Sequence, residues 1–372
     1  MIRCKTCCMP NTRPDVPFFG GVCGACLNHE KRPAIDWGAR HKELIALLDR
    51  HDGRVIVPSS GGKDSSYIAL RLKGLGADVT AVTATTCLPT PIGRANIDNL
   101  ARHVRTIEVT PNKVTRAKLN RLGLEMVGDA SWPQHASIWA IPFRMAVATK
   151  TPLLMWGENS QDAYGGPVGS EAAKQMTRRW CSEFGGLNGL RAADFIGVEG
   201  IEERDMLDYQ LPSDEELARA GVEGHFLGSY EEWDSRRNAD VAIEHGMRAE
   251  LPCKANWWSF ENLDCFVTAW HDHGMYRKFG FGRGCAQISI DVRSGRIGRD
   301  EALEWVRVHD GIFPETYAGM TTADGLHAIS MTRAELMAAM DRFTDWSLFD
   351  RVEDGRPILK EFAKYRAEKN AS

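Results

Sequence analysis

Short apolar runs alternate with amphipathic stretches along the first half of the chain. The runs predict buried β-strands at 55–57, 78–84, 105–110 and 152–156, because each is brief and bounded by turn residues. Apolar residues on a helical period predict helices at 36–49, 67–72, 94–103, 112–121 and 134–149. Strands that alternate with helices favour an α/β fold with a doubly wound parallel sheet, whose ligands bind at the carboxyl ends of the strands.

The alternation stops after residue 166. Between Pro167 and Asn256 the strand pattern lapses, and the clearer elements are helices predicted at 214–220 and 231–245. Amphipathic helices predicted at 301–308 and 333–343 indicate a mainly helical carboxyl region. We interpret 167–256 as an insertion and lid region.

Composition narrows the class of protein. The chain has 372 residues, 43% hydrophobic and 26% charged, so it can bury a core without disulfides. No apolar run is long enough to cross a membrane, and 46 basic against 50 acidic residues give a net charge of −4. We therefore expect no membrane partner and no nucleic-acid partner. The first residues lack a secretory signal, which predicts a cytoplasmic protein whose ten cysteines bind metal or stay as free thiols.

Four cysteines near the amino terminus form two Cys-x2-Cys pairs. Cys4 and Cys7 are separated by 15 residues from Cys23 and Cys26, a spacing typical of zinc ribbons. Each short pair places two thiolates on one side of an ion, so the four predict a tetrahedral structural zinc site. Cys8 could replace Cys7, and an iron–sulfur cluster is the alternative occupant.

A glycine-rich turn follows the strand at 55–57. Backbone N–H groups of such a turn, together with the amino end of the helix after it, form a cradle for phosphate. A Walker A loop requires Ser or Thr after Gly-Lys, but Asp64 follows Gly62-Lys63 here, so this is not an ordinary P-loop. Ser60-Gly61-Gly62-Lys63-Asp64-Ser65 instead matches the SGGxDS signature of the PP-loop ATP pyrophosphatases.

The resemblance to PP-loop enzymes implies ATP as the bound nucleotide. The loop would hold the departing pyrophosphate, Lys63 would neutralise it, Asp64 would help to place Mg²⁺, and the adenosine would lie over the next strand near Thr83. The residues expected to bind the nucleotide in this part of the chain are Ser59, Ser60, Gly61, Gly62, Lys63, Asp64, Ser65 and Thr83.

A second polar loop, 157–166, follows the strand at 152–156 and reaches the same edge of the sheet. Gly157 would allow close approach of the nucleotide, and the carboxylates of Glu158 and Asp162 could hold Mg²⁺. A loop whose glycines and carboxylates only turn the chain is the alternative interpretation.

Several separated stretches resemble one family, the N-acetyl sugar amidotransferases, which are PP-loop enzymes of bacterial surface-polysaccharide pathways. Where that family usually has Glu-Tyr-Gly-Gly, this chain has Asp162-Ala163-Tyr164-Gly165-Gly166. The stretches that carry the resemblance are 60–65, 93–97, 157–159, 164–166, 278–283, 291–297 and 299–302.

The resemblance implies conversion of a sugar acetamido group to an acetamidino group, with ATP, Mg²⁺ and Zn²⁺ as cofactors. ATP would adenylate the amide oxygen, releasing pyrophosphate, and ammonia would then displace AMP. The residues implied to act in catalysis are Lys63, Asp64 and Asp162. Those implied to contact the sugar substrate are Asn96, Asn159, Tyr164, Gly165, Lys278 and Arg283.

Ammonia must be supplied to such a reaction. An amino-terminal cysteine nucleophile is not expected, since Ile2 and Arg3 precede Cys4 and the metal site claims Cys4. The resemblance therefore implies a separate glutaminase subunit, with a cyclase-like channel partner, and an N-acetylated, nucleotide-linked sugar as substrate.

A tRNA-thiolating PP-loop enzyme is the competing interpretation, because some of those enzymes also carry Cys-x2-Cys pairs before the phosphate loop. Cys87 and Cys181 would then handle sulfur, but the pattern favours isolated buried cysteines for both.

The expected organisation has four parts. They are metal-binding knuckles at 1–35, a PP-loop nucleotide-binding domain at 36–166, the insertion or lid at 167–256, and a helical substrate region at 257–372.

Overall fold

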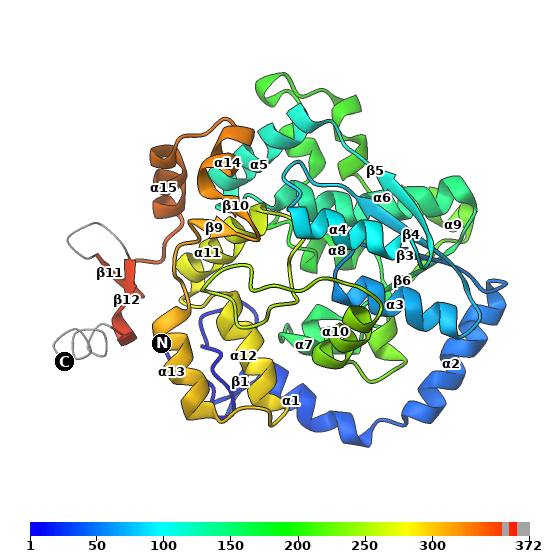
Figure 1. Ribbon diagram of the computed structural model, residues 1–372, viewed down its shortest axis with the longest axis horizontal. Helices are drawn as coiled ribbons and strands as arrows, with labels where there is room; N and C mark the ends of the chain where they lie inside the picture. Colours follow the sequence, from blue (N-terminus) through cyan, green and yellow to red (C-terminus); the bar gives the residue numbers. More distant parts are fainter. Residues whose placement is uncertain (352–356, 363–372) are drawn as a thin grey trace.

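The computed structural model describes residues 1–351 and 357–362 and contains a six-stranded sheet of order β5-β4-β3-β6-β8-β7, with β3 to β6 labelled on the right of Figure 1. All neighbouring strands pair in parallel except β7, which lies antiparallel at one edge. The strands are β3 (Arg54–Pro58), β4 (Asp78–Ala84), β5 (Arg105–Val109), β6 (Leu153–Trp156), β7 (Gln175–Met176) and β8 (Glu223–Phe226). The predicted α/β fold with a parallel sheet is confirmed.

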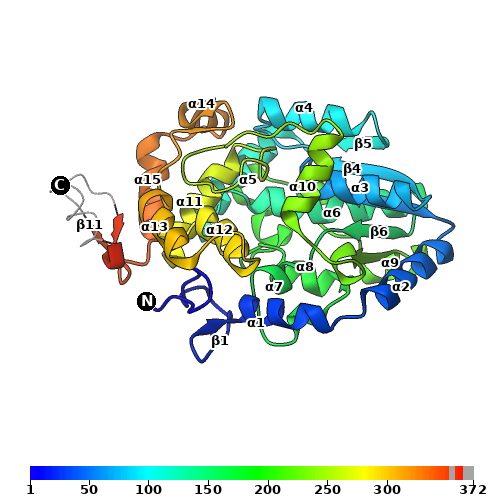
Figure 2. The ribbon, with the colours of Figure 1, turned by 60° about the horizontal axis from the view of Figure 1, so that its bottom comes forward.

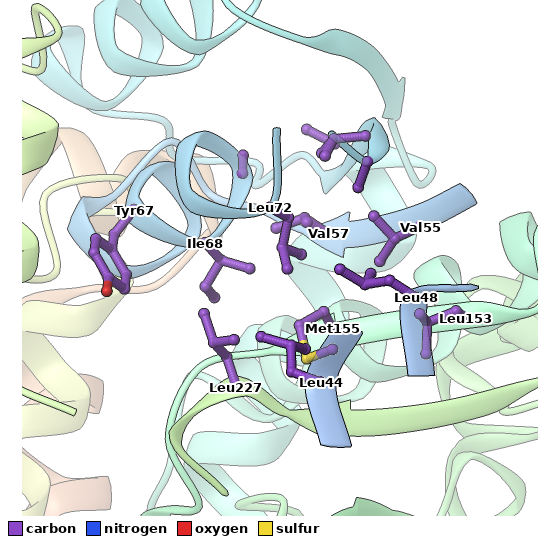
Figure 3. Packing of buried hydrophobic residues seen from close by; sticks show 14 of the residues in the cluster. Leu44, Leu48, Val55, Val57, Tyr67, Ile68, Leu72, Leu153, Met155 and Leu227 are labelled. Atoms are coloured by element: carbon purple, nitrogen blue, oxygen red, sulfur yellow. The ribbon is translucent and has the colours of Figure 1, made fainter. Parts of the chain in front are cut away.

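Helices cover both faces of the sheet, as a doubly wound fold requires. Val55 and Val57 face the helices α2 (Trp37–Arg50) and α3 (Lys63–Gly74), and Figure 3 shows this packing. Ile56 points to the opposite face, toward α6 (Trp132–Thr149) and α8 (Arg178–Phe184). Because successive side chains of a strand alternate between faces, a fully apolar run such as 55–57 is stable only when both faces are covered.

Capping residues set the helix boundaries. Helix α4 (Pro91–Leu100) begins three residues before its predicted start, because the Thr90 hydroxyl accepts a hydrogen bond from the Gly93 N–H. Asn112 caps α5 (Lys113–Val127) in the same manner, and the left-handed Gly128 ends that helix. The segments 94–103 and 112–121 are therefore helical as predicted, with shifted ends.

The segment 167–256 contains two strands, so the prediction of a strand-free stretch is wrong there. Residues Glu223–Phe226 of β8 pair with Leu153–Trp156 of β6, and β7 pairs with β8. The sequence Glu-Gly-His-Phe has no apolar run, and its place in the sheet comes from backbone pairing with β6. The helices of this segment are η2 (Ser170–Ala172), α8, η3 (Ala192–Phe195), η4 (Val198–Gly200), η5 (Glu203–Tyr209), α9 (Asp214–Ala220), η6 (Leu227–Ser229) and α10 (Ser235–Glu244).

The carboxyl region is mainly helical, as predicted. Its helices are α11 (Val267–Phe279), α12 (Arg283–Arg293), α13 (Arg299–His309), α14 (Thr322–Ala328) and α15 (Arg333–Arg342). Its short strand pairs are β9 (Thr316–Tyr317) with β10 (Met320–Thr321), and β11 (Phe349–Arg351) with β12 (Pro357–Leu359). The part of the predicted region at 352–356 and 363–372 lies outside the described residues.

The first 35 residues form a small cysteine lobe beside the carboxyl helices. It contains β1 (Phe18–Phe19), β2 (Val22–Cys23), α1 (Gly24–Lys31) and η1 (Arg32–Ala34). Figure 2 shows the lobe below α12 and α13, and its buried cysteines share one apolar cluster with residues of those helices. The cysteine lobe is thus packed against helices of the carboxyl region.

The order of the strands places two loops together. From β3 the chain runs to β4 on one side, and after β5 it returns to β6 on the other side of β3. The loops that follow β3 and β6 therefore leave the sheet at a switch point, where open α/β sheets bind their ligands. None of the helices in the described residues combines the length and apolar character that crossing a membrane requires.

Candidate active site

The turn between β3 and α3 has the geometry of a phosphate cradle. Gly61 has a φ of +75°, and a Cβ there would lie 2.6 Å from the backbone nitrogen of Ile97, so this position requires glycine. The Gly61 N–H donates to the Ser59 Oγ at 3.0 Å, and that hydroxyl also bonds the Ser65 Oγ at 3.0 Å. Gly62 then forms the amino cap of the 12-residue helix α3, whose first N–H groups are free to bind an anion.

Lys63 lies at the base of this cradle among carboxylates. Its side chain is 2% exposed, and its Nζ contacts the Asp64 carboxylate and lies 3.3 Å from Glu261 Oε1. Burial disfavours the charged ammonium, but Asp64, Glu261 and Glu158 outweigh that cost and raise the pKa of Lys63. The side chain therefore stays cationic, as a group that neutralises phosphate must.

Two carboxylates next to Lys63 fit a divalent cation. Asp64 Oδ1 is buried and has no hydrogen-bond partner in the described part of the chain, which leaves a ligand atom unused. Burial and the nearby Asp64 raise the pKa of Glu158 to about 7, although Lys63 opposes this. A divalent cation between these groups and phosphate oxygens would relieve the repulsion, so Asp64 and Glu158 are the residues that would hold Mg²⁺.

A cavity of about 660 Å³ opens above the cradle. Part of its lining, here called the aromatic end, consists of Trp139, Trp156, Trp180 and Phe184, whose rings contact one another. Another part, here called the polar end, brings together residues from distant parts of the chain. They are Arg13, Pro14, Asp129, His135, Tyr164, Glu261, His271, Lys278 and Arg283.

Three basic side chains, Arg13, Lys278 and Arg283, line the polar end. Arg283 bonds the Asp272 carboxylate at 3.1 Å, and Lys278 donates to the Val127 carbonyl. Arg13, from the cysteine lobe, makes neither an ion pair nor a side-chain hydrogen bond with any described residue, although it lines the cavity. Burial lowers the pKa of Arg13, the hydroxyl of Tyr164 opposes this, and Arg283 adds to the lowering. An anionic group of a ligand would fit between these arginines.

Most of the predicted nucleotide residues line the cavity, namely Ser59, Ser60, Gly62, Lys63, Asp64, Ser65, Gly157 and Glu158. Gly61 lies beneath the cradle and packs against α4, and Thr83 is buried between the cavity-lining Val82 and Ala84. Of the predicted sugar contacts, Tyr164, Lys278 and Arg283 line the cavity. The roles of all these residues stay predictions.

Four other predicted residues lie away from the cavity. Asn96 bonds the backbone of Arg248 through both ends of its amide, and Asn159 caps α7 (Ser160–Ala163) and donates to the Ser170 carbonyl. Asp162 forms an ion pair with Arg32 at 2.8 Å in a separate hollow of about 200 Å³. Gly165 packs on Val16 and Ala25 of the cysteine lobe. The structure brings none of these four to Lys63.

Sequence reasoning missed Asp129, His135, Glu261, His271 and Arg13. Glu261 and His271 lie in the carboxyl region, far from the phosphate loop in sequence, and only the fold brings them to it. Asp129 carried one local signal, since Gly128-Asp129 lies between two predicted helices where a turn exposes polar groups. Nothing in the spacing of these five residues links them to one another.

The four predicted cysteines of the knuckles come together as a metal-ligand group. Their sulfur atoms all lie within 4.8 Å of one another, with 3.8 Å between Cys4 and Cys26 and 3.7 Å between Cys7 and Cys23. A tetrahedral zinc ion with Zn–S bonds of ~2.3 Å separates its sulfurs by about 3.8 Å, so the donor set and spacing fit zinc. Cys8 is not part of the group, and its backbone carbonyl accepts a hydrogen bond from the Cys285 thiol at 3.5 Å.

Arginines tie the cysteine lobe to the rest of the site. Arg299 of α13 donates to the carbonyls of Cys4 and Cys7, at 2.9 and 3.2 Å. Arg293 of α12 donates at 2.8 Å to the carbonyl of Ala163, next to Tyr164. Helix α12 therefore holds the loop that carries Tyr164, Gly165 of that loop packs on the lobe, and the lobe brings Arg13 to the cavity.

Neither candidate sulfur carrier reaches the cavity. Cys87 donates to Asn120 at 3.2 Å in a different cluster, and burial raises the pKa of its thiol. Cys181 is fully buried in α8, where burial raises the pKa to about 12. Protonated, enclosed thiols are poor nucleophiles.

We predict that the protein binds one zinc ion through the cysteine group. Cys26→Ser will lose the metal and expose residues 1–35 to protease, because the four ligands gather turns that contain little regular structure of their own. Metal content by plasma mass spectrometry and limited proteolysis measure both effects.

Cys8→Ser is the matched control and will keep its zinc. Loss of zinc from Cys8→Ser, or iron in place of zinc in the purified protein, would contradict the assignment.

We also predict a pH-dependent gain of stability in Glu158→Gln. A folded pKa of about 7, above the ordinary value of 4.5, means that the folded state binds more protons between these values, so stability falls as pH rises through this window. Removing the charge should raise Tm at pH 8, and the gain should shrink toward pH 5.

Thermal melts of the ligand-free protein at both pH values measure the effect, with the exposed Glu301→Gln as control. An unchanged or lower Tm of Glu158→Gln at pH 8 would show that Glu158 is not strained by its neighbours.

One comparison with known families bears on the carboxyl region. Residues 257–365 match the family model described as LPS biosynthesis protein WbpG-like, C-terminal domain. No curated protein matches the chain. The carboxyl region, which supplies Glu261, His271, Lys278 and Arg283 to the cavity, is therefore similar to the C-terminal domain of WbpG-like LPS biosynthesis proteins.

Proposed function

We propose that this protein is an ATP-dependent amidotransferase that converts the acetamido group of a sugar to an acetamidino group in lipopolysaccharide biosynthesis. One observation carries the proposal: a single cavity is lined both by the phosphate cradle and by the region that is similar to an LPS-biosynthesis domain. A nucleotide held by the cradle and a sugar held by that region would meet inside it.

The reaction needs ATP because an amide is a poor electrophile and its oxygen is a poor leaving group. Attack of the amide oxygen on the α-phosphorus of ATP forms an adenylated imidate and releases pyrophosphate. Ammonia then adds to the imidate carbon, and AMP leaves. The protein's part is mainly to position the two substrates and stabilise charge.

The shape of the cavity supports one orientation of ATP. The aromatic end, with Trp139 and Trp180, fits an adenine ring, and the cradle with Lys63 fits the departing pyrophosphate. Mg²⁺, held by Asp64 and Glu158, would supply further positive charge against the phosphates. The α-phosphate would then lie between the aromatic end and the cradle.

The polar end suits a charged sugar derivative. Arg13 and Arg283 could bind the phosphate of a nucleotide-linked sugar or a sugar carboxylate, because guanidinium groups pair with both anions. Tyr164 lines the same cavity. We assign ammonia supply to a separate glutaminase subunit with a cyclase-like channel partner, and place the reaction in the cytoplasm, where ATP and nucleotide sugars are found.

The thiolating alternative receives no support from the cavity. Cys87 and Cys181 are absent from its lining. Thiolation by a PP-loop enzyme needs a thiol that can reach the adenylated base, and neither of these side chains does.

The test is turnover with ATP, Mg²⁺, ammonium and a panel of nucleotide-linked N-acetyl sugars, following AMP and product mass. We expect sugar-dependent AMP and a product in which NH replaces one oxygen. AMP formation that depends on tRNA and on no sugar would contradict the proposal.

We predict that Lys63→Met lowers sugar-dependent AMP formation by about 100-fold or more, since it removes the cation that faces the departing pyrophosphate. Lys73→Met is the matched control on the same helix, because its ammonium bonds the His103 carbonyl at the surface. Equal activity of Lys63→Met and wild type would show that Lys63 does not contribute to the reaction.

A further inference from the structure

Asp129, at the turn between α5 and α6, is held by four hydrogen bonds at the polar end of the cavity. The backbone N–H and hydroxyl of Ser131 donate to its Oδ1 at 2.9 and 2.6 Å. Asn188 donates to its Oδ2 at 3.1 Å, and His271 Nδ1 lies 2.9 Å from Oδ1. The carboxylate is thus buried, ionised and fixed in orientation.

His271, on α11, is the exposed partner of this pair. Its side chain is 21% exposed, against 6% for Asp129, and its ring lines the cavity. Because the ionised Asp129 can only accept a hydrogen bond, Nδ1 of His271 carries the proton. Nε2 is then the basic nitrogen of the neutral ring, and it is the nitrogen not engaged by Asp129.

Two histidines line the polar end, and their neighbours shift the two pKa values in opposite directions, which favours His271 as the one that exchanges protons. Burial lowers the pKa of His271, but Asp129 and Asp272 outweigh it and raise that pKa, against the effect of Arg283. The neighbouring His135 ring lies 5.2 Å away and perpendicular; burial and His271 lower its pKa to about 4. Lys278 is the other cation near Asp129, and burial lowers its pKa.

His135 has a different task. Its Nδ1 donates to the Gly186 carbonyl at 3.2 Å, and a Cβ on Gly186 would lie 2.6 Å from that nitrogen. The His135 ring is therefore held in place and neutral. It packs perpendicular to the His271 ring and lines the cavity.

We propose that His271, oriented by Asp129, accepts the proton that ammonia loses when it attacks the activated amide. This inference rests on the proposed function and assigns the acid–base group of its second step. Neither residue was marked by any sequence motif.

The step balances as follows. The ammonia lone pair forms the new C–N bond, and the electron pair of the C=N bond moves to the sugar nitrogen. A proton of the resulting ammonium passes to Nε2 of His271. The lone pair of the sugar nitrogen then restores the C=N bond while the C–O bond breaks, and AMP leaves with that electron pair. The imidazolium returns its proton to the strongly basic amidine product.

His271→Gln tests the proposal with two nucleophiles. With ammonia as nucleophile we expect the rate of amidine formation to fall by about 100-fold or more, as for loss of a general base. With hydroxylamine, whose adduct is far more acidic and sheds its proton to water, we expect a fall of less than about tenfold. The exposed His327→Gln is the control and should match wild type with both nucleophiles.

Other outcomes would overturn the assignment. Full activity of His271→Gln with ammonia excludes a catalytic role, and equal losses with both nucleophiles indicate that His271 only shapes the site. Asp129→Asn provides a second variant, for which we expect a smaller loss with the same dependence on nucleophile. Binding of ATP to each variant, measured by calorimetry, confirms that the cradle is folded.

Failure of the proposed function gives a different result. In that case wild type itself forms no AMP in response to any N-acetyl sugar, with either nucleophile. Wild-type turnover combined with a fully active His271→Gln rejects the assignment of His271 alone.

Discussion

The buried ion pair between Lys63 and Glu261 joins the phosphate cradle to the carboxyl region. Lys63 begins α3 at the switch point of the sheet, and Glu261 lies in the segment before α11. The side-chain amide of Gln287 on α12 donates to the second carboxylate oxygen of Glu261 at 2.6 Å. Loss of Glu261 would leave the buried ammonium with Asp64 as its remaining carboxylate partner, so the Lys63–Glu261 pair stabilises the contact between the two regions. Both regions line the cavity.

A second set of buried contacts holds the carboxyl region in place. Asp291 of α12 accepts hydrogen bonds from the indole N–H groups of Trp257 and Trp258, at 2.7 and 2.9 Å, and from Arg236 of α10. The stretch 291–297, which carries part of the resemblance to amidotransferases, therefore connects α12 to α10 through Asp291. It lies outside the cavity lining. A sequence motif can thus reflect a structural contact as readily as a substrate contact.

The sequence predicted those parts of the fold that depend on local pattern. The run 55–57 has to be covered on both faces, and Gly61-Gly62 has to turn, so the central strand and the cradle were predictable. The cysteine pairs likewise gather as their spacing requires. Strand β8 was not predictable, because Glu223-Gly224-His225-Phe226 becomes a strand through pairing with β6. The family resemblance implies a catalytic role for Asp162, but its carboxylate pairs with Arg32 and lies outside the cavity lining. The Asp129–His271 pair joins residues 142 positions apart, and no local pattern encodes that contact.

The central claim is that AMP is transferred from ATP to the amide oxygen of the sugar inside the cavity, which activates the amide. A substrate sugar with ¹⁸O in its N-acetyl carbonyl tests this most directly, with mass spectrometry of the AMP and pyrophosphate that are released. The account predicts one ¹⁸O in AMP and none in pyrophosphate, because the amide oxygen bonds the α-phosphorus and departs with it. Label in pyrophosphate, or AMP without label, would contradict it.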